Sequence, residues 1–210
     1  ALAAGGHRPR ALIVACNTAT VHALPALRAA LEPDVPVIGT VPAIKPAAAG
    51  GGKIAIWATP ATTGSAYQRG LIRDFAGGAE VTEVPCPGLA DAVEHADQEA
   101  VDRAVAAAAA LTPTDVRAVV LGCTHYELVE ERILAALEAR RREGLPPLVF
   151  HGSADAVAAQ ALRRIGAEPA PDADSTGTLS VLLSGRPGRL PAAALAYAEG
   201  RGLAETAPAH

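Results

Sequence analysis

The sequence contains no methionine, and only 3% of its 210 residues are aromatic. Alanine, valine and leucine therefore have to fill the core, because 50% of the chain is hydrophobic. No apolar run of about 18 residues indicates a membrane span, and no charged start followed by an apolar core indicates a signal peptide. Three cysteines without Cys-x-x-Cys spacing exclude a disulfide scaffold and a zinc ribbon, and they favour a reducing cytoplasm.

An excess of basic residues is also lacking, because 18 lysines and arginines stand against 22 aspartates and glutamates, for a net charge of -4. This balance disfavours a nucleic-acid-binding surface, which needs a basic patch. The histidines other than His125 share no ligand spacing, so we expect no metal site. Because the chain opens without a methionine, we expect an N-terminal piece to be absent and residues 1–6 to end a helix already under way.

Short apolar runs alternate with longer amphipathic ones along the chain. The short runs predict strands at residues 11–15, 35–39, 53–57, 81–84, 116–121 and 148–150. The longer runs predict helices at residues 18–31, 62–75, 97–111, 128–142 and 153–165. This alternation indicates an α/β fold with mostly parallel sheets covered by helices. A polar, proline-rich linker at 169–177 precedes a last strand at 178–184 and a last helix at 191–200.

A weak internal repeat divides the chain. An apolar strand delivers Cys16 to a strand-to-helix turn, and a second strand delivers Cys123 to a similar turn 107 residues later. That interval suits one α/β lobe, so we expect two similar lobes with the active site between them. We assign residues 1–40 to an incomplete first lobe, 41–146 to a second lobe, and 147–210 to a return segment with a C-terminal extension.

A cysteine at the carboxyl end of a parallel strand lies where α/β sheets bind ligands. The amides of the following helix favour a thiolate or a bound carboxylate there. A free thiol with a pKa of about 8.5 is only a few per cent ionised at neutral pH, so the site has to lower the pKa of at least one thiol that acts as a base. Asn17, Thr18 and Thr124 add hydrogen-bonding groups, and His125 can change protonation near neutrality. Two facing thiols would invert a stereocentre without a cofactor.

Two motifs carry a resemblance to a known family. Cys-Asn-Thr-Ala at residues 16–19 and Gly-Cys-Thr-His-Tyr at residues 122–126 resemble the paired signatures of glutamate racemases, in the aspartate/glutamate racemase superfamily. Segments at 39–47, 57–62 and 86–94 resemble further parts of that family in the same order, and the similarity covers residues 11–166. The resemblance implies cofactor-independent interconversion of L- and D-glutamate, which supplies D-glutamate for peptidoglycan in the cytoplasm.

The resemblance also implies a role for each matching position. Cys16 and Cys123 are implied as the two acid/base thiols, one for each enantiomer. His125 is implied to assist Cys123, and Glu94 to orient His125. Contacts with the substrate are implied at Asn17, Thr18, Thr59, Thr62 and Thr124. A histidine after Gly-Cys-Thr favours glutamate over aspartate, and contacts between subunits in the family make a homodimer an open expectation.

Several positions depart from the family pattern. Nothing before Cys16 matches the family's Asp-Ser-Gly and Tyr-Gly elements, so about sixty residues, or two strand–helix units, are expected to be absent from the first lobe. Glu127 stands where the family usually has proline, a change we interpret as local to a helix start. Residues 151–153, His-Gly-Ser, stand where relatives often carry Asp-Ser. Three alternatives stay open: an aspartate or other small-acid racemase, a truncated non-catalytic fragment, and a lobe retained for protein interaction. Cys86, between two prolines, is expected to be a packed structural thiol.

Overall fold

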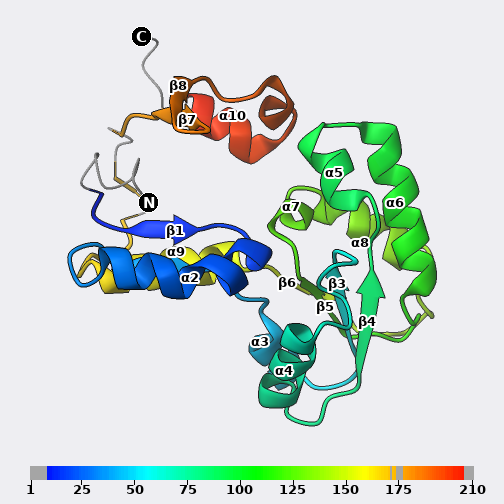
Figure 1. Ribbon diagram of the computed structural model, residues 1–210. Helices are drawn as coiled ribbons and strands as arrows, with labels where there is room; N and C mark the ends of the chain where they lie inside the picture. The colour runs from blue at the N-terminus through cyan, green and yellow to red at the C-terminus, as the bar shows by residue number, and fades with distance from the viewer. Residues whose placement is uncertain (1–8, 171, 174–176, 206–210) are drawn as a thin grey trace.

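The computed structural model describes residues 9–170, 172–173 and 177–205, so the helix end expected at residues 1–6 lies outside this part of the chain. Within it, three sheets are present (Figure 1). One contains two parallel strands, one contains four parallel strands in the order β4-β3-β5-β6, and the third is an antiparallel hairpin. Helices flank both parallel sheets (Figure 1). The α/β class with parallel, helix-covered sheets is therefore confirmed.

The smaller parallel sheet forms the first unit of the structure. It consists of β1 (Leu12–Val14) and β2 (Val37–Gly39), with α2 (Asn17–Leu31) between them in the chain and α9 (Ala154–Arg164) packed against β2. The hydroxyls of Thr20 and Thr40 both donate to the carbonyl oxygen of Val14, at 3.3 and 2.8 Å. These bonds fix the end of β1, from which the chain turns into α2.

The second unit is the four-stranded sheet with helices on both faces. Its strands are β3 (Ile54–Ala58), β4 (Val81–Pro85), β5 (Ala118–Leu121) and β6 (Val149–His151). Its helices are α3 (Ile44–Ala49), α4 (Ala66–Phe75), α5 (Leu89–Glu94), α6 (Gln98–Leu111), α7 (Thr124–Glu127) and α8 (Glu130–Glu138). Every residue of β3 and β5 is buried, which explains why both strands are continuous apolar runs in the sequence.

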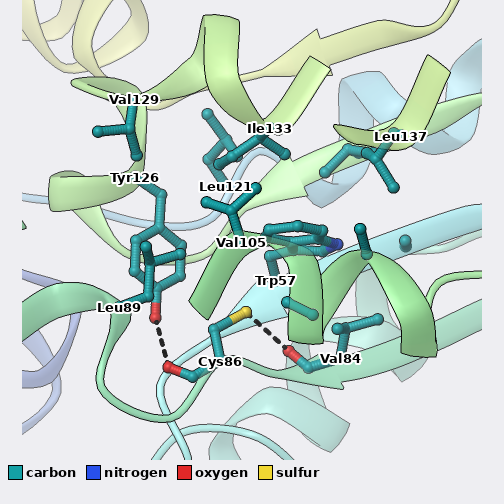
Figure 2. Packing of buried hydrophobic residues seen from close by; sticks show 14 of the residues in the cluster. Trp57, Val84, Cys86, Leu89, Val105, Leu121, Tyr126, Val129, Ile133 and Leu137 are labelled. Carbon is teal, nitrogen blue, oxygen red and sulfur yellow. Dashed lines mark hydrogen bonds between the residues drawn. The ribbon is translucent and has the colours of Figure 1, made fainter. Parts of the chain in front are cut away.

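Two apolar clusters lie on opposite faces of this second sheet. Side chains alternate along β3, so Ala55 and Trp57 join one cluster while Ile54 and Ile56 join the other. Figure 2 shows the first cluster, in which the Tyr126 hydroxyl donates to the Cys86 carbonyl at 3.4 Å. The Cys86 thiol donates to the Val84 carbonyl at 3.5 Å, and burial raises its pKa to about 12. Cys86 is thus the packed structural thiol that its sequence context predicts.

The C-terminal part of the described chain forms a small unit of its own. It contains β7 (Val181–Leu183), β8 (Arg186–Gly188), the 3₁₀-helix η1 (Ala192–Ala196) and α10 (Ala198–Glu205). Its contact with the second unit includes Tyr197, whose side chain belongs to the apolar cluster on that sheet and whose hydroxyl donates to the Val93 carbonyl at 2.8 Å. The last strand expected at 178–184 is therefore half of a hairpin, and the last helix is a 3₁₀-helix followed by α10.

Other differences from the expected elements have local causes. The helix expected at 62–75 begins only at Ala66, because the amides of Thr62 and Thr63 bond back to the Thr59 carbonyl at 2.9 Å in a preceding turn. In place of the helix expected at 128–142, the structure has the shorter α8, which covers only residues 130–138. The preceding helix α7 ends at Glu127. The six-residue helices α3 and α5 were not expected at all. Beyond the boundary set at residue 146, β6 still pairs with β5, and the return to the first unit comes with α9.

Candidate functional site

Cys16 stands at the junction between β1 and α2. It is the N-cap of that fifteen-residue helix, with extended backbone angles, and its Sγ accepts a hydrogen bond from the Ala19 amide at 3.5 Å. A thiol thus takes the place that serine or aspartate usually fills at a helix start. Cys16 is exposed to solvent. Its sulfur therefore lies at the positive end of the α2 dipole and within reach of a small molecule.

Cys123 occupies the corresponding junction between β5 and α7. It is the N-cap of α7 and is half-buried, with its Sγ 3.7 Å from the Nδ1 atom of His125. Burial raises the pKa of the Cys123 thiol, and the neighbouring Cys16 adds to this shift. The expectation of a lowered pKa is therefore not met at Cys123, which is a protonated thiol at neutral pH.

The two cysteine turns are joined by a reciprocal pair of hydrogen bonds. The Asn17 side-chain amide donates to the Gly122 carbonyl at 2.8 Å, and the Thr124 hydroxyl donates to the Ala15 carbonyl at 3.2 Å. Gly122 directly precedes Cys123, and Ala15 directly precedes Cys16. A side chain of each turn thus bonds to the residue that precedes the cysteine of the other turn. The two sulfurs therefore lie on facing turns of the two units.

A carboxylate supports the histidine of the second turn. The Nε2 atom of His125 lies 3.5 Å from Oε2 of Glu94, which stands at the end of α5. With Cys123 near one ring nitrogen and Glu94 near the other, the imidazole can exchange a proton with the thiol while its charge is balanced. The structure therefore brings together the three residues in the order that the sequence motifs imply.

A pocket of about 330 Å³ opens beside the first turn. Of the predicted substrate contacts, Asn17, Thr18 and Thr62 line it. Thr59 does not line the pocket, but its hydroxyl lies 3.3 Å from the hydroxyl of Thr62. Thr124 is not part of the lining either. Tyr67 on α4 also lines the pocket, and the sequence motifs gave no signal for it.

Asn17 carries a second feature that suits a binding site. The residue is 5% exposed, and within the described ranges no donor bonds to its Oδ1 atom. A buried amide oxygen without a donor costs free energy of about 1–3 kcal/mol. A ligand that donates a hydrogen bond at this position would remove the cost.

Glu127 and the His-Gly-Ser segment, two of the departures from the family pattern, contact each other. Both carboxylate oxygens of Glu127 cap the start of α9, accepting from the Ser153 amide at 2.7 Å, the Ser153 hydroxyl at 2.8 Å and the Ala154 amide at 3.3 Å. A Cβ on Gly152 would lie 2.6 Å from Glu127 Oε2, so glycine makes room for the cap. The interpretation of Glu127 as local to its own helix start is wrong, because it caps a helix 26 residues further along the chain.

The family model for Asp/Glu/hydantoin racemases matches residues 1–161. The chain belongs to the Asp/Glu/hydantoin racemase family. It is similar to the glutamate racemase of Clostridium novyi, with 37% identity over 61% of this chain and 51% of the relative. It is also similar to that of Aliivibrio fischeri, with 41% identity over 60% and 48% of the two chains. The chain spans about half the length of these curated racemases.

Solved racemase structures match the fold as well. The structure of Escherichia coli glutamate racemase in complex with L-glutamate and the activator UDP-MurNAc-ala matches with a TM-score of 0.66 and 31% identity, covering 84% of this chain and 66% of the other. The Thermus thermophilus glutamate racemase in complex with beta-chloro-D-alanine matches with a TM-score of 0.55 and 29% identity, covering 80% and 62%. The resemblance read from the motifs is therefore confirmed at the level of the racemase family.

Two kinds of feature are absent from the described residues. No cluster of three or more histidine, cysteine, aspartate or glutamate side chains in them is arranged to hold a metal ion. No helix in them has both the length and the apolar character needed to cross a membrane.

Proposed function

We propose that this chain is a glutamate racemase unit that interconverts L- and D-glutamate without a cofactor. The observation that carries the proposal is the reciprocal pairing of the two cysteine turns through Asn17 and Thr124. That pairing sets one thiol on each of two facing units, which is the arrangement that proton transfer to opposite faces of one carbon requires. Family membership and the L-glutamate complex of the Escherichia coli relative support glutamate as the substrate.

In the proposed mechanism one thiolate removes the α-proton, and the opposite thiol delivers a proton to the other face. The raised pKa of Cys123 makes it the proton donor in the resting form. For the reverse reaction Cys123 must act as the base, and Nδ1 of His125 then takes the thiol proton while Glu94 balances the imidazolium. The developing carbanion is stabilised by the amides at the start of α2 and by nearby hydroxyls.

Binding of the amino acid is assigned to the polar groups of the pocket lined by Asn17 and Thr18, the two residues that follow Cys16. The hydroxyls of Thr18 and Thr62 donate to a carboxylate of the substrate. The buried Oδ1 atom of Asn17 accepts from the ammonium group once a shift of the first turn uncovers it. Thr59 orients Thr62, and Thr124 holds the two turns together. The active site therefore lies between the two lobes, and its product, D-glutamate, would serve peptidoglycan synthesis in the cytoplasm. A homodimer stays an expectation.

The direct test follows the circular dichroism of L-glutamate with the purified chain, and in parallel the loss of the α-proton signal in deuterated water. We expect racemisation, and we expect Cys16→Ser and Cys123→Ser each to reduce it by about a thousandfold, because a serine hydroxyl is a far weaker acid than a thiol. Cys86→Ala is the control for the loss of a thiol, since Cys86 is buried and its thiol donates to the Val84 carbonyl. Because Cys86 packs in the same apolar cluster as Cys123, we expect a change in rate that is small beside the thousandfold loss.

The alternatives give different results in the same assay. Faster turnover of L-aspartate or another small acid than of L-glutamate would change the substrate but keep the chemistry. A folded chain that neither racemises nor exchanges the α-proton of any acid in the panel would identify a non-catalytic fragment. Full activity in either serine variant would contradict the two-thiol mechanism.

A further inference from the structure

Tyr197 attaches the C-terminal part of the chain to the second unit. It lies beyond residues 1–161, which the family model matches, and is 9% exposed. Its ring packs in the apolar cluster of the second sheet, and its hydroxyl donates to the Val93 carbonyl at 2.8 Å. Burial raises the pKa of Tyr197, so the hydroxyl keeps its proton at neutral pH. Figure 1 shows α10 and η1, which flank this residue, near α5.

The carbonyl that Tyr197 binds lies in the last turn of α5. Helix ends leave carbonyl groups without partners inside the helix, and side chains can bind them. The Val93 carbonyl also accepts from the Ala96 amide at 3.0 Å, so the Tyr197 hydroxyl joins backbone donors there. Because α5 has only six residues, its own hydrogen bonds fix its end weakly. The contact with Tyr197 therefore adds a constraint at the point where α5 ends.

Glu94, the residue next to Val93, continues this path to the site. Its Oε2 atom lies 3.5 Å from Nε2 of His125, and Nδ1 of the same ring lies 3.7 Å from the Cys123 sulfur. A small rotation of the end of α5 would change the first of these distances directly. Cys16 is a neighbour of Cys123, but its Sγ bonds to the Ala19 amide of its own helix and not to His125 or Glu94.

We propose that Tyr197 is a positioning residue, which holds the end of α5 so that Glu94 stays against His125 and, through the imidazole, supports Cys123. The expected effect on racemisation rests on the proposed function, whereas the positioning of α5 and Glu94 by Tyr197 does not. It also gives the C-terminal segment a role. The chain runs from α9, which packs on β2 of the first unit, to an anchor on α5 of the second.

The test compares Tyr197→Phe with the unmodified chain by thiol alkylation, which needs no racemase activity. Iodoacetamide labelling is measured separately for Cys16 and Cys123 by peptide mass spectrometry, over a range of pH. The phenylalanine keeps the ring and removes only the hydroxyl. We expect Cys123 to be labelled about three- to tenfold more slowly near neutral pH, the range that one lost hydrogen bond corresponds to. Cys16 should be labelled at its original rate, and racemisation should fall by a similar factor.

Arg201→Gln is the matched control. Arg201 donates to the carbonyls of Leu195 and Ala196 at 3.1 and 3.0 Å, so its loss loosens the C-terminal unit without removing the bond to α5. We expect this variant to label like the unmodified chain. An unchanged Cys123 rate in a folded Tyr197→Phe chain, or equal acceleration of both cysteines, would overturn the proposal. If the chain shows no racemisation at all, the proposed function fails while the labelling still decides the role of Tyr197.

Discussion

The two cysteine turns share one local design but lie in different surroundings. Each follows a parallel strand and starts a helix with the cysteine as N-cap. The first leaves a two-stranded sheet on which Ile13 is 43% exposed, whereas the second leaves a strand paired on both sides and fully buried. Cys16 is accordingly exposed, and Cys123 is half-buried.

This difference in burial sets what each thiol needs in order to react. Removing a thiol from water disfavours its charged form, and burial indeed raises the pKa of Cys123. The same turn has a histidine and a carboxylate within reach, His125 and Glu94, which can take the thiol proton and balance the resulting charge. At Cys16 the sulfur instead accepts a helix amide in an exposed position. Similar strand–turn–helix units thus place two thiols in different environments.

The difference in burial between the two parallel sheets should have its largest effect on the free energy of unfolding. Ile56 of β3 is 1% exposed, whereas Ile13 of β1 is 43% exposed. We expect Ile56→Ala to lower the free energy of unfolding by about 2–5 kcal/mol, because it leaves a cavity in the core. We expect Ile13→Ala to cost only about 0.5 kcal/mol. Urea denaturation followed by far-ultraviolet circular dichroism measures both, and equal losses would show that the two sheets are buried alike.

The next largest effect concerns the histidine that distinguishes the turns. In the proposed mechanism His125 accepts the Cys123 proton, so we expect His125→Asn to lower racemisation by about a hundredfold. The fall in kcat/KM must be equal in both directions, since the two enantiomers have equal free energies. Iodoacetamide labelling separates the turns, with Cys123 slowed and Cys16 unchanged. A variant with full activity would show that Cys123 needs no support from the imidazole.

The elements that the sequence could predict are those whose signals are local. Continuous apolar runs such as residues 116–121 indicate buried parallel strands, and the residues that follow them identify the turns. The helices α3 and α5 were missed because six residues are too few to show a helical period. The hairpin β7–β8 did carry a readable signal. Its turn residues Ser184 and Gly185 both have positive φ, which is typical of a tight hairpin turn with Ser-Gly at its centre.

In the candidate site, too, the sequence predicted local features but not contacts between distant segments. The motifs predicted that Cys16, Asn17 and Thr124 belong together, and the structure joins their turns. The motifs did not show that Asn17 and Thr124 bond to the residues before the opposite cysteines, because such contacts depend on how the two units pack. The cap of α9 by Glu127 was missed for the same reason. A substitution that looks local in sequence can be compensated at a distant position.

The cap by Glu127 links the two compared regions, so breaking it gives a further, smaller test. We expect Glu127→Ala to cost about 1 kcal/mol, as the loss of a helix cap usually does. Gly152→Ala places a methyl group 2.6 Å from the Glu127 carboxylate and should cost a similar amount by displacing it. Because both changes act on one contact, the double variant should be little worse than either single one. Additive losses in urea denaturation would show that glycine and glutamate act independently.

The smallest effect separates the two regions by their response to acid. Glu32 accepts from the Val37 amide at 3.0 Å and from Arg164 on α9 at 2.7 Å, and these bonds, in that order, lower its pKa. A carboxylate with a lowered pKa contributes stability above its unfolded pKa of about 4.3 and loses this contribution as the pH falls through the folded pKa.

In the second unit Lys53 likewise lowers the pKa of Asp115, but there two apolar clusters remain when the carboxylate is protonated. The amides of β2 should therefore lose protection from hydrogen exchange at a higher pH than those of β5, and Glu32→Gln should remove the pH dependence of β2. Loss of protection at one common pH in both strands, unaffected by Glu32→Gln, would mean that the ion pairs of the first unit do not hold it together.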